Sequence, residues 1–159
     1  MTRILITGGA GFIGHALTQI LLARGDMVFG IDNLNDYYDP QLKRDRLASL
    51  TSQNFTFAQV DFADRVALDT AMAGQHFDTI VHLGAQAGVR YSIDNPRAYV
   101  QSNLVGHLEI LELARTRAIP MVYASSSSVY GGTPNCHSAS KTGWTGRCRF
   151  MPRRKRPTN

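Results

Sequence analysis

The chain has 159 residues, of which 43% are hydrophobic and 18% are charged, and this balance excludes an intrinsically disordered protein. The sequence contains no run of 18 or more apolar residues, so it predicts no membrane span. Because Arg3 leads directly into a short apolar run and then glycines, without the pattern of a signal peptide, we expect a cytoplasmic protein.

Charge is distributed unevenly along the sequence. Residues 1–135 hold ten Lys and Arg against twelve Asp and Glu, a net charge of −2, whereas residues 136–159 hold seven basic residues and no acid. Cys136, Trp144 and Cys148 also lie in this tail. The change in composition predicts a folded domain over 1–135 and an aberrant, disordered basic tail over 136–159.

The first half of the chain alternates short apolar runs with helical patterns. Residues 3–7 predict a buried strand, and residues 12–24 predict a helix with apolar positions 13, 17, 20 and 21, ended by Gly25. Strands are expected over 27–32 and 55–61, with a helix over 40–50 between them.

The second half continues the alternation. A helix is expected over 64–73, a strand over 78–85 and a strand over 121–125. Between these two strands, Asn95-Pro96 opens a long helix that closes before Pro120 and carries one apolar face of Val100, Leu104, Leu108 and Leu111. Five apolar strands separated by helices predict an α/β fold, a doubly wound parallel sheet that is incomplete.

Glycines 8, 11 and 14 lie between the first strand and the first helix. In that context Gly8 permits a tight turn, Gly11 lets the backbone approach a pyrophosphate, and Gly14 allows close packing of helix on strand. The alternative is a glycine-rich turn without a ligand. The strand–turn–helix context favours dinucleotide binding.

Asp32 ends the second strand 18 residues after Gly14, close to the spacing of an acid that binds ribose hydroxyls. A carboxylate there favours NAD over NADP, although Lys43 or Arg44 folding back would soften the preference, and a simple strand-end cap is the alternative. Asp61, after the third strand, is a candidate for adenine contact or for a helix cap.

Several motifs then occur together and in order: TGGAGFIG at 7–14, HLGAQAGVRYS at 82–92, Asn103, and SSSSVYG at 125–131. This combination resembles the extended short-chain dehydrogenase/reductase family of nucleotide-sugar enzymes. Within that family, DNLNDYYDPQLKRDRL at 32–47 resembles UDP-glucuronate 4-epimerases. The resemblance covers residues 2–135 and implies a Rossmann-like fold, NAD as cofactor and a homodimer for the full-length protein.

The resemblance also implies roles for individual residues. Alanine is more common in the family where this chain has Gly84, and we expect the glycine to be tolerated. The cofactor positions are Gly8, Gly11, Phe12, Ile13 and Gly14 at the pyrophosphate, Asp32 and Asn33 at the adenosine ribose, Asp61 and Phe62 beside adenine, Leu83, Gly84, Ala85 and Gln86 at the nicotinamide half, and Asn103 in support.

A serine at the end of the fifth strand contacts the sugar hydroxyl in this family, which implies Ser126, with Ser127 as its neighbour, as catalytic residues; a polar turn is the alternative. No metal site is expected. The histidines have no metal-ligand spacing, and Cys136, His137 and Cys148 are three candidates without a fourth.

The family pattern breaks at the catalytic tyrosine, since no tyrosine in this chain is followed by lysine four residues later. In the YxxxK motif the lysine lowers the pKa of the tyrosine, which acts as the base. Reading the tail one base earlier, with permitted codons, is compatible with a YAATK segment. We therefore infer a frameshift near residues 135–136.

The expected function is that of the cofactor half of an NAD-dependent epimerase that interconverts UDP-glucuronate and UDP-galacturonate by hydride removal and return at C4. Other epimerases or dehydratases of the family and a non-catalytic NAD-binding protein are alternatives. Nucleic-acid binding by the basic tail is disfavoured, because aromatic residues are not interleaved with its charges.

Overall fold

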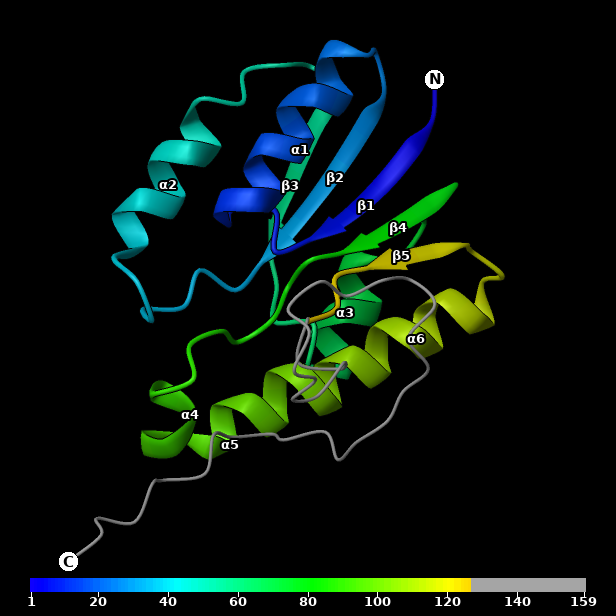
Figure 1. Cartoon of the computed structure of the whole chain (residues 1–159). Coiled ribbons are helices and arrows are strands. Elements are labelled where there is room, and N and C mark those ends of the chain that lie inside the picture. Colours follow the sequence, from blue (N-terminus) through cyan, green and yellow to red (C-terminus); the bar gives the residue numbers. More distant parts are fainter. Residues whose placement is uncertain (127–159) are drawn as a thin grey trace, which may run out of the picture. The chain divides into compact units, whose positions relative to one another are not determined.

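The computed structural model describes residues 1–126 (Figure 1). The chain divides into two compact units, Met1–Tyr123 and Ala124–Asn159. The helices and strands described below belong to the first unit. The basic tail predicted over 136–159 and the boundary predicted at residue 135 lie outside the described residues.

Five parallel strands form one sheet in the order β3-β2-β1-β4-β5. They are β1 (Arg3–Thr7), β2 (Met27–Asp32), β3 (Phe55–Gln59), β4 (Thr79–His82) and β5 (Met121–Tyr123). The chain adds β2 and β3 on one side of β1 and then β4 and β5 on the other, so the predicted doubly wound, Rossmann-like α/β fold is confirmed.

Three strands end earlier than predicted. β3 and β5 stop two residues short, and β4 stops at His82 rather than at residue 85. After the amide of Leu83 donates to the carbonyl of Thr7, the next amide, that of Gly84, donates to the Thr7 hydroxyl instead of a strand backbone. A side chain therefore ends the ladder between β1 and β4.

Helices cover both faces of the sheet. α1 (Phe12–Ala23) and α2 (Pro40–Ala48) lie on one face, and α3 (Arg65–Ala71) and α6 (His107–Thr116) lie on the other (Figure 1). The carboxylates of Asp39 and Asp64 accept backbone N–H groups at the starts of α2 and α3. Gly25, with φ +92°, follows α1 as predicted.

Adjacent side chains of β1 point into two cores. Leu5 packs in the larger core with Leu68 of α3 and Ile110 of α6. Ile6 packs in the smaller core with Leu21 of α1. Because both β1 side chains are 0% exposed, the central strand is covered on both faces, and its carboxyl end is the place where a ligand can approach.

Two of the four apolar residues predicted to form one face of α1 lie exposed to solvent. Ile13 and Ile20 are 65% and 66% exposed, while Leu21 is buried. Gly14 and Thr18 are the other buried positions, and the Thr18 hydroxyl donates to the Gly14 carbonyl at 2.8 Å. Small side chains at these two positions, rather than Ile13 and Ile20, set the packing of α1 on the sheet.

The long helix predicted from Asn95-Pro96 is divided into segments. α5 (Pro96–Tyr99) leads into the π-helical segment η1 (Val100–Gly106), which continues directly into α6. A separate short helix, α4 (Tyr91–Asp94), precedes them and has no counterpart among the predicted elements. π-helical turns are rare and occur often at functional sites.

The apolar face predicted for the long helix does not point into the core. Val100, Leu104, Leu108 and Leu111 are 48%, 54%, 53% and 40% exposed, whereas Ile110 is 0% exposed. A π-helix closes its hydrogen bonds over five residues instead of four. Apolar spacing counted at 3.6 residues per turn therefore loses its register with the buried face when it crosses η1.

Candidate cofactor site

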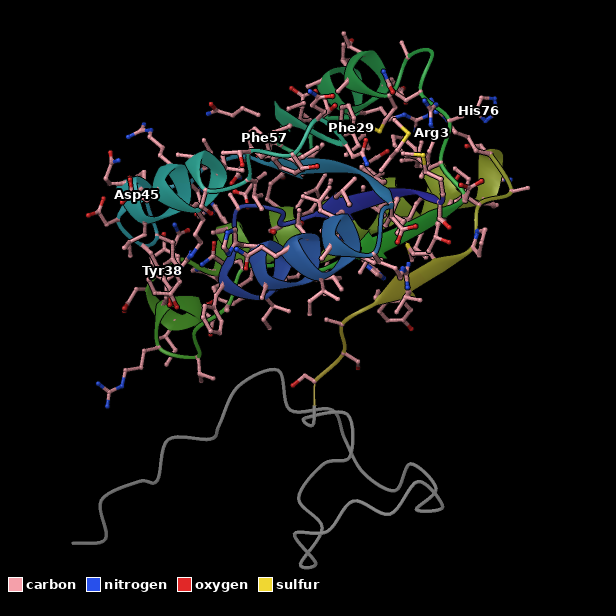
Figure 2. All side chains as sticks on the ribbon, turned by 90° about the horizontal axis from the view of Figure 1, so that it is seen from above. Arg3, Phe29, Tyr38, Asp45, Phe57 and His76 are labelled. Carbon is pink, nitrogen blue, oxygen red and sulfur yellow. The ribbon has the colours of Figure 1, made fainter. Side chains whose placement is uncertain are left out.

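A pocket of about 370 Å³ opens at the carboxyl ends of the strands. Figure 2 shows Tyr38, one of its lining residues, at the end of the unit opposite to Arg3 and His76. Open α/β sheets bind ligands at this edge, where the strand order reverses. The lining residues are Gly8, Gly11, Phe12, Asp32, Asn33, Asn35, Tyr37, Tyr38, Asp39, Leu42, Lys43, Arg46, Phe62, Leu83, Gly84, Ala85, Gln86, Ala87 and Ser102.

The turn between β1 and α1 leaves no room for side chains. Gly8 has φ +70°, and a Cβ on it would lie 2.9 Å from the amide nitrogen of Gly84. A Cβ on Gly14 would lie 2.1 Å from the carbonyl oxygen of Gly8, and one on Gly11 would lie 3.0 Å from the same oxygen. The three glycines therefore let the turn pack against both α1 and the loop after β4.

The amino terminus of α1 is suited to an anion. Gly11 is its N-cap residue and offers no side chain to accept the first helical N–H groups. Gly11 and Phe12 both line the pocket. Because these amides and the helix dipole favour negative charge, the residues present fit a pyrophosphate at the glycine end of the pocket.

Asp32 and Lys43 form a buried ion pair in the wall of the pocket. The Lys43 ammonium lies 3.1 Å from Oδ1 of Asp32 and 3.0 Å from Oδ1 of Asn35, and the two charged residues are 9% and 6% exposed. The amide of Leu34 donates to the same Oδ1 of Asp32. Within residues 1–126, Oδ2 of Asp32 accepts no hydrogen bond, so this oxygen can accept one from a ligand.

Asp61 supports the pocket from outside it. Its Oδ2 accepts the Asn33 amide at 3.2 Å, and its Oδ1 accepts the backbone amide of Ala63 at 2.9 Å. The cap of α3 is Asp64, not Asp61. Asp61 therefore orients Asn33, which does line the pocket; a contact of Asp61 with adenine stays a prediction.

Phe62 fills the space between the strand ends and η1. It is 7% exposed, and its ring stands edge to face with His82 at a centroid distance of 5.3 Å. A Cβ on Gly84 would lie 2.5 Å from Cε1 of this ring, and one on Gly106 would lie 2.4 Å from Cε2. The glycines at 84 and 106 are thus matched to the bulk of Phe62.

His82 and Thr7 hold the loop after β4. The Thr7 hydroxyl lies 2.6 Å from Nδ1 of His82 and accepts the Gly84 amide at 3.0 Å. Burial, with a smaller contribution from the neighbouring His107, lowers the pKa of His82 to about 4. The ring is therefore neutral at pH 7, and its Nδ1 shares a hydrogen bond with the Thr7 hydroxyl.

Asn103 and Tyr99 hold the next part of the same loop. Asn103 of η1 accepts the Gln86 amide at 2.8 Å and donates to the Gln86 carbonyl at 3.0 Å. The Tyr99 hydroxyl donates to the carbonyls of Ala87 and Gly88, and burial raises its pKa above the ordinary value. Long-range side chains therefore fix the backbone of this wall.

Most residues with a predicted cofactor role surround the pocket. Four do not line it: Ile13 is exposed, Gly14 supports the turn, and Asp61 and Asn103 support lining residues. The lining members are Gly8, Gly11, Phe12, Asp32, Asn33, Phe62, Leu83, Gly84, Ala85 and Gln86. Ser126 belongs to the second compact unit, and Ser127 lies outside the described residues.

Sequence reasoning missed several residues of the site. Nothing in the local sequence distinguishes Thr7 or Tyr99, because their partners are far away in the chain. Arg46 had a usable signal: it follows Lys43 by three residues, which places both on one face of a helix. Both line the pocket.

The described part of the chain offers neither a metal site nor a membrane-spanning helix. Residues 1–126 contain no group of three or more His, Cys, Asp or Glu side chains that could hold a metal ion. No helix described there is long and apolar enough to cross a bilayer. The zinc alternative at Cys136, His137 and Cys148 lies outside the described residues.

The chain is similar in sequence to several longer proteins. It is 50% identical over 130 residues to Protein CapI of Staphylococcus aureus, covering 81% of this chain and 39% of that protein. It is 45% identical over 144 residues to a UDP-glucuronate 4-epimerase of Thermodesulfobacterium geofontis, covering 89% and 45%. The chain thus spans less than half the length of these curated relatives.

Solved structures show the same fold. The UDP-glucose 4-epimerase of Thermus thermophilus, in complex with NAD, matches with a TM-score of 0.75 and 33% identity over 91% of this chain and 44% of that one. A variant UDP-glucuronic acid 4-epimerase of Bacillus cereus, in complex with NAD and UDP-4-deoxy-4-fluoro-glucuronic acid, matches with a TM-score of 0.77 and 32% identity, over 87% and 44%.

A family model bears on the chain as a whole. The model described as GDP-mannose 4,6 dehydratase matches residues 5–147, which is most of the sequence and includes every element that lines the pocket. With the glycine turn, the sheet order and the epimerase neighbours in agreement, the chain belongs to this family of NAD-dependent epimerases and dehydratases.

Proposed function

We propose that this chain is the NAD-binding part of a nucleotide-sugar epimerase that interconverts UDP-glucuronate and UDP-galacturonate. The observation that carries the proposal is the single pocket in which the glycine turn, Asp32 and the loop after β4 meet. Similarity to UDP-glucuronate 4-epimerases of Thermodesulfobacterium geofontis and Arabidopsis thaliana supports the substrate class. Since the chain spans only part of these relatives, the activity belongs to the proposal.

In this proposal each side of the pocket holds one part of NAD. Gly8, Gly11 and the first amides of α1 bind the pyrophosphate, with Phe12, Ile13 and Gly14 shaping that turn. Asp32 and Asn33 bind the adenosine ribose, with Asp61 and Phe62 toward adenine. Residues 83–86, held by Asn103, line the nicotinamide half.

The proposal favours NAD over NADP because of Asp32. Lys43 does fold back onto this carboxylate, as sequence analysis allowed, but it shares Oδ1 with the Leu34 amide and leaves Oδ2 for a ligand. A 2′-phosphate would approach that negative oxygen, whereas ribose hydroxyls can donate to it.

Calorimetric titration with both cofactors tests this assignment. NAD is expected to bind at least tenfold more tightly than NADP. Asp32→Asn is expected to reduce this difference in affinity, because it removes the charge that repels the 2′-phosphate of NADP. Gly11→Val is expected to abolish binding of both, since its side chain would enter the turn. Tighter binding of NADP by the wild-type chain would overturn the role of Asp32.

When bound, NAD supplies the acceptor for a hydride from sugar C4 and returns that hydride to the other face. The chain offers Ser126, or its neighbour Ser127, as the hydrogen-bond partner of the C4 hydroxyl. It contains no YxxxK motif to take the hydroxyl proton. A positioned base contributes roughly a hundred- to ten-thousandfold to such a step, so we expect no turnover of UDP-glucuronate; turnover above background would contradict this.

A frameshift near residue 135 accounts for the missing motif in this proposal. Restoring the frame is expected to give a protein with YxxxK and a C-terminal substrate domain, active on UDP-glucuronate, cytoplasmic and homodimeric. The exposed apolar residues of η1 and α6 support self-association. Sequencing the coding DNA beyond codon 135 tests the frameshift. Assays of the restored enzyme on several nucleotide sugars distinguish UDP-glucuronate epimerisation from 4,6-dehydration and galactose epimerisation.

A non-catalytic NAD-binding protein is the second candidate. The absence of YxxxK from the sequence favours it for the chain as written. If the DNA holds no shifted epimerase frame while the chain binds NAD, this second function is correct. If the frame is present, Ser126→Ala in the restored enzyme is expected to lower turnover and leave NAD binding nearly unchanged.

A further inference from the structure

Two basic residues of α2 line the pocket, and they differ in what they contact. Lys43 is buried and paired with Asp32 and Asn35. Arg46, one helical turn later, is half-buried and forms no ion pair with any carboxylate of residues 1–126. The positive charge of Lys43 is therefore neutralised within the protein, and the charge of Arg46 is not.

Arg46 reaches from α2 to the glycine turn. Its Nη1 donates to the carbonyl of Ala10 across 3.4 Å, a long and weak contact, and its guanidinium carbon lies 5.9 Å from the centre of the Phe12 ring. Ala10 and Phe12 flank Gly11, the N-cap of α1. The guanidinium thus lies beside the amides to which the pyrophosphate is assigned.

The position of α2 is fixed by contacts at both of its ends. The Asp39 side chain accepts the Gln41 amide at its start, and Ser49, just after its end, lies 2.8 Å from Nε2 of His15 on α1. Lys43 adds an anchor to β2 in the middle. A helix held at three points presents Arg46 from a fixed backbone, so only the torsions of the side chain itself have to be ordered when it binds an anion.

We propose that Arg46 is a specificity-determining residue of this site: its guanidinium binds the pyrophosphate of the dinucleotide beside the first amides of α1. A guanidinium has several N–H donors in one plane, so it can exchange the weak Ala10 contact for phosphate oxygens. Arg46 therefore makes the site bind ligands that carry a diphosphate more tightly than a nucleoside alone. The inference rests on the proposed NAD site and adds a residue to it.

A ligand series separates this role from a general effect on the pocket. Adenosine, ADP and NAD are titrated by calorimetry into the wild-type chain, Arg46→Gln and Arg44→Gln. Arg44→Gln is the matched control, because Arg44 is an exposed arginine of the same helix and does not line the pocket. Arg46→Gln is expected to weaken ADP and NAD by roughly tenfold to a hundredfold and to leave adenosine unchanged. Arg44→Gln is expected to change none of them.

Salt dependence and thermal unfolding complete the test. The slope of log Kd for ADP against log salt is expected to fall in Arg46→Gln, while the melting temperature stays that of the wild type because the Ala10 contact is weak. Equal affinity of wild type and Arg46→Gln for ADP, or an equal loss for adenosine and ADP, would overturn the role of Arg46. Wild-type chain that binds neither NAD nor ADP would instead overturn the proposed function itself.

Discussion

The two sides of the pocket are held in place by different kinds of contact. On the side of the β1–α1 turn, backbone packs on backbone, and glycines make this possible. On the side of the loop after β4, side chains reach across the fold: Thr7 binds Gly84 over a separation of 77 residues, and Asn103 binds Gln86 over 17. The first side is therefore expected to respond most to an added side chain, and the second to a lost hydrogen bond.

The largest effect is expected from an added side chain at the turn. In Gly14→Val, a Cβ built on the native backbone would lie 2.1 Å from the Gly8 carbonyl oxygen. The helix and the turn therefore cannot both keep their positions. We expect a loss of about 4 kcal/mol or more in the free energy of unfolding and no detectable NAD binding, measured by urea denaturation and calorimetry.

Gly74→Ala is the contrasting control for that experiment. Gly74 has positive φ, +68°, which Gly14 does not have, and nothing lies within 4 Å of a Cβ there, so this variant introduces backbone strain without crowding. Backbone strain alone is expected to cost about 1 kcal/mol, with unchanged NAD affinity. Similar losses in Gly14→Val and Gly74→Ala would show that crowding does not govern the turn.

The second effect concerns pH and the side of the β4 loop. Since burial lowers the pKa of His82 from 6.5 to about 4, the unfolded chain binds this proton more readily than the folded one. The stability that neutral His82 allows is fully present above pH 6.5. As the pH falls toward 4, protonation of His82 in the unfolded chain lowers the free energy of unfolding by up to about 3 kcal/mol. Urea denaturation from pH 7 to 4 measures it.

His82→Gln provides the comparison, because glutamine does not titrate. All other titratable groups, including the neighbouring His107, are the same in both proteins, so the difference between the two pH profiles isolates His82. We expect the stability of the variant to fall less steeply between pH 6.5 and 4. Parallel profiles would contradict the lowered pKa of His82.

A smaller effect is expected from Asn103. Asn103→Leu removes both hydrogen bonds to the Gln86 backbone and is expected to lower the free energy of unfolding by about 2 kcal/mol, since a net hydrogen bond contributes about 1 kcal/mol. NAD affinity is expected to fall as well. Asn103→Asp keeps the acceptor but loses the donor, so an intermediate result in both measurements checks the interpretation.

The smallest effect is expected at Gly84, where the glycine turn and the loop after β4 meet. Gly84→Ala brings a Cβ to 2.5 Å from the Phe62 ring, and we expect a loss of about 1–2 kcal/mol as the ring shifts. Phe62→Leu in the same chain is expected to recover part of it. Additive losses in the double variant would show that Gly84 and Phe62 are not coupled.

These contrasts explain how much of the molecule its sequence could predict. Strands, the parallel sheet and the glycine turn depend on residues close together in the chain, so periodicity and spacing indicate them. The outward-facing side of η1 and α6 could not be predicted, because a π-helical segment changes the register that the apolar spacing at Leu104 and Leu108 presupposes.

The candidate site divides in the same way. Gly8, Gly11 and Asp32 stand out locally, and the structure places them in one pocket. Thr7 and Tyr99 could not be distinguished from ordinary strand and helix residues, since their contacts appear only when β1, the β4 loop and α5 come together. The family resemblance supplied Asn103, for which local spacing gives no reason.

The central place of β1 also sets an order on folding. β1 pairs with β2, where Ile4 lies opposite Val28, and with β4, where Ile4 lies opposite Thr79. Closing the longer loop costs about 1 kcal/mol more in chain entropy. During synthesis at roughly 5–20 residues per second, β4, the second strand partner of β1, emerges several seconds after β2. The glycine turn can therefore form while the ribosome is still making the wall opposite to it, and the pocket closes only at the end.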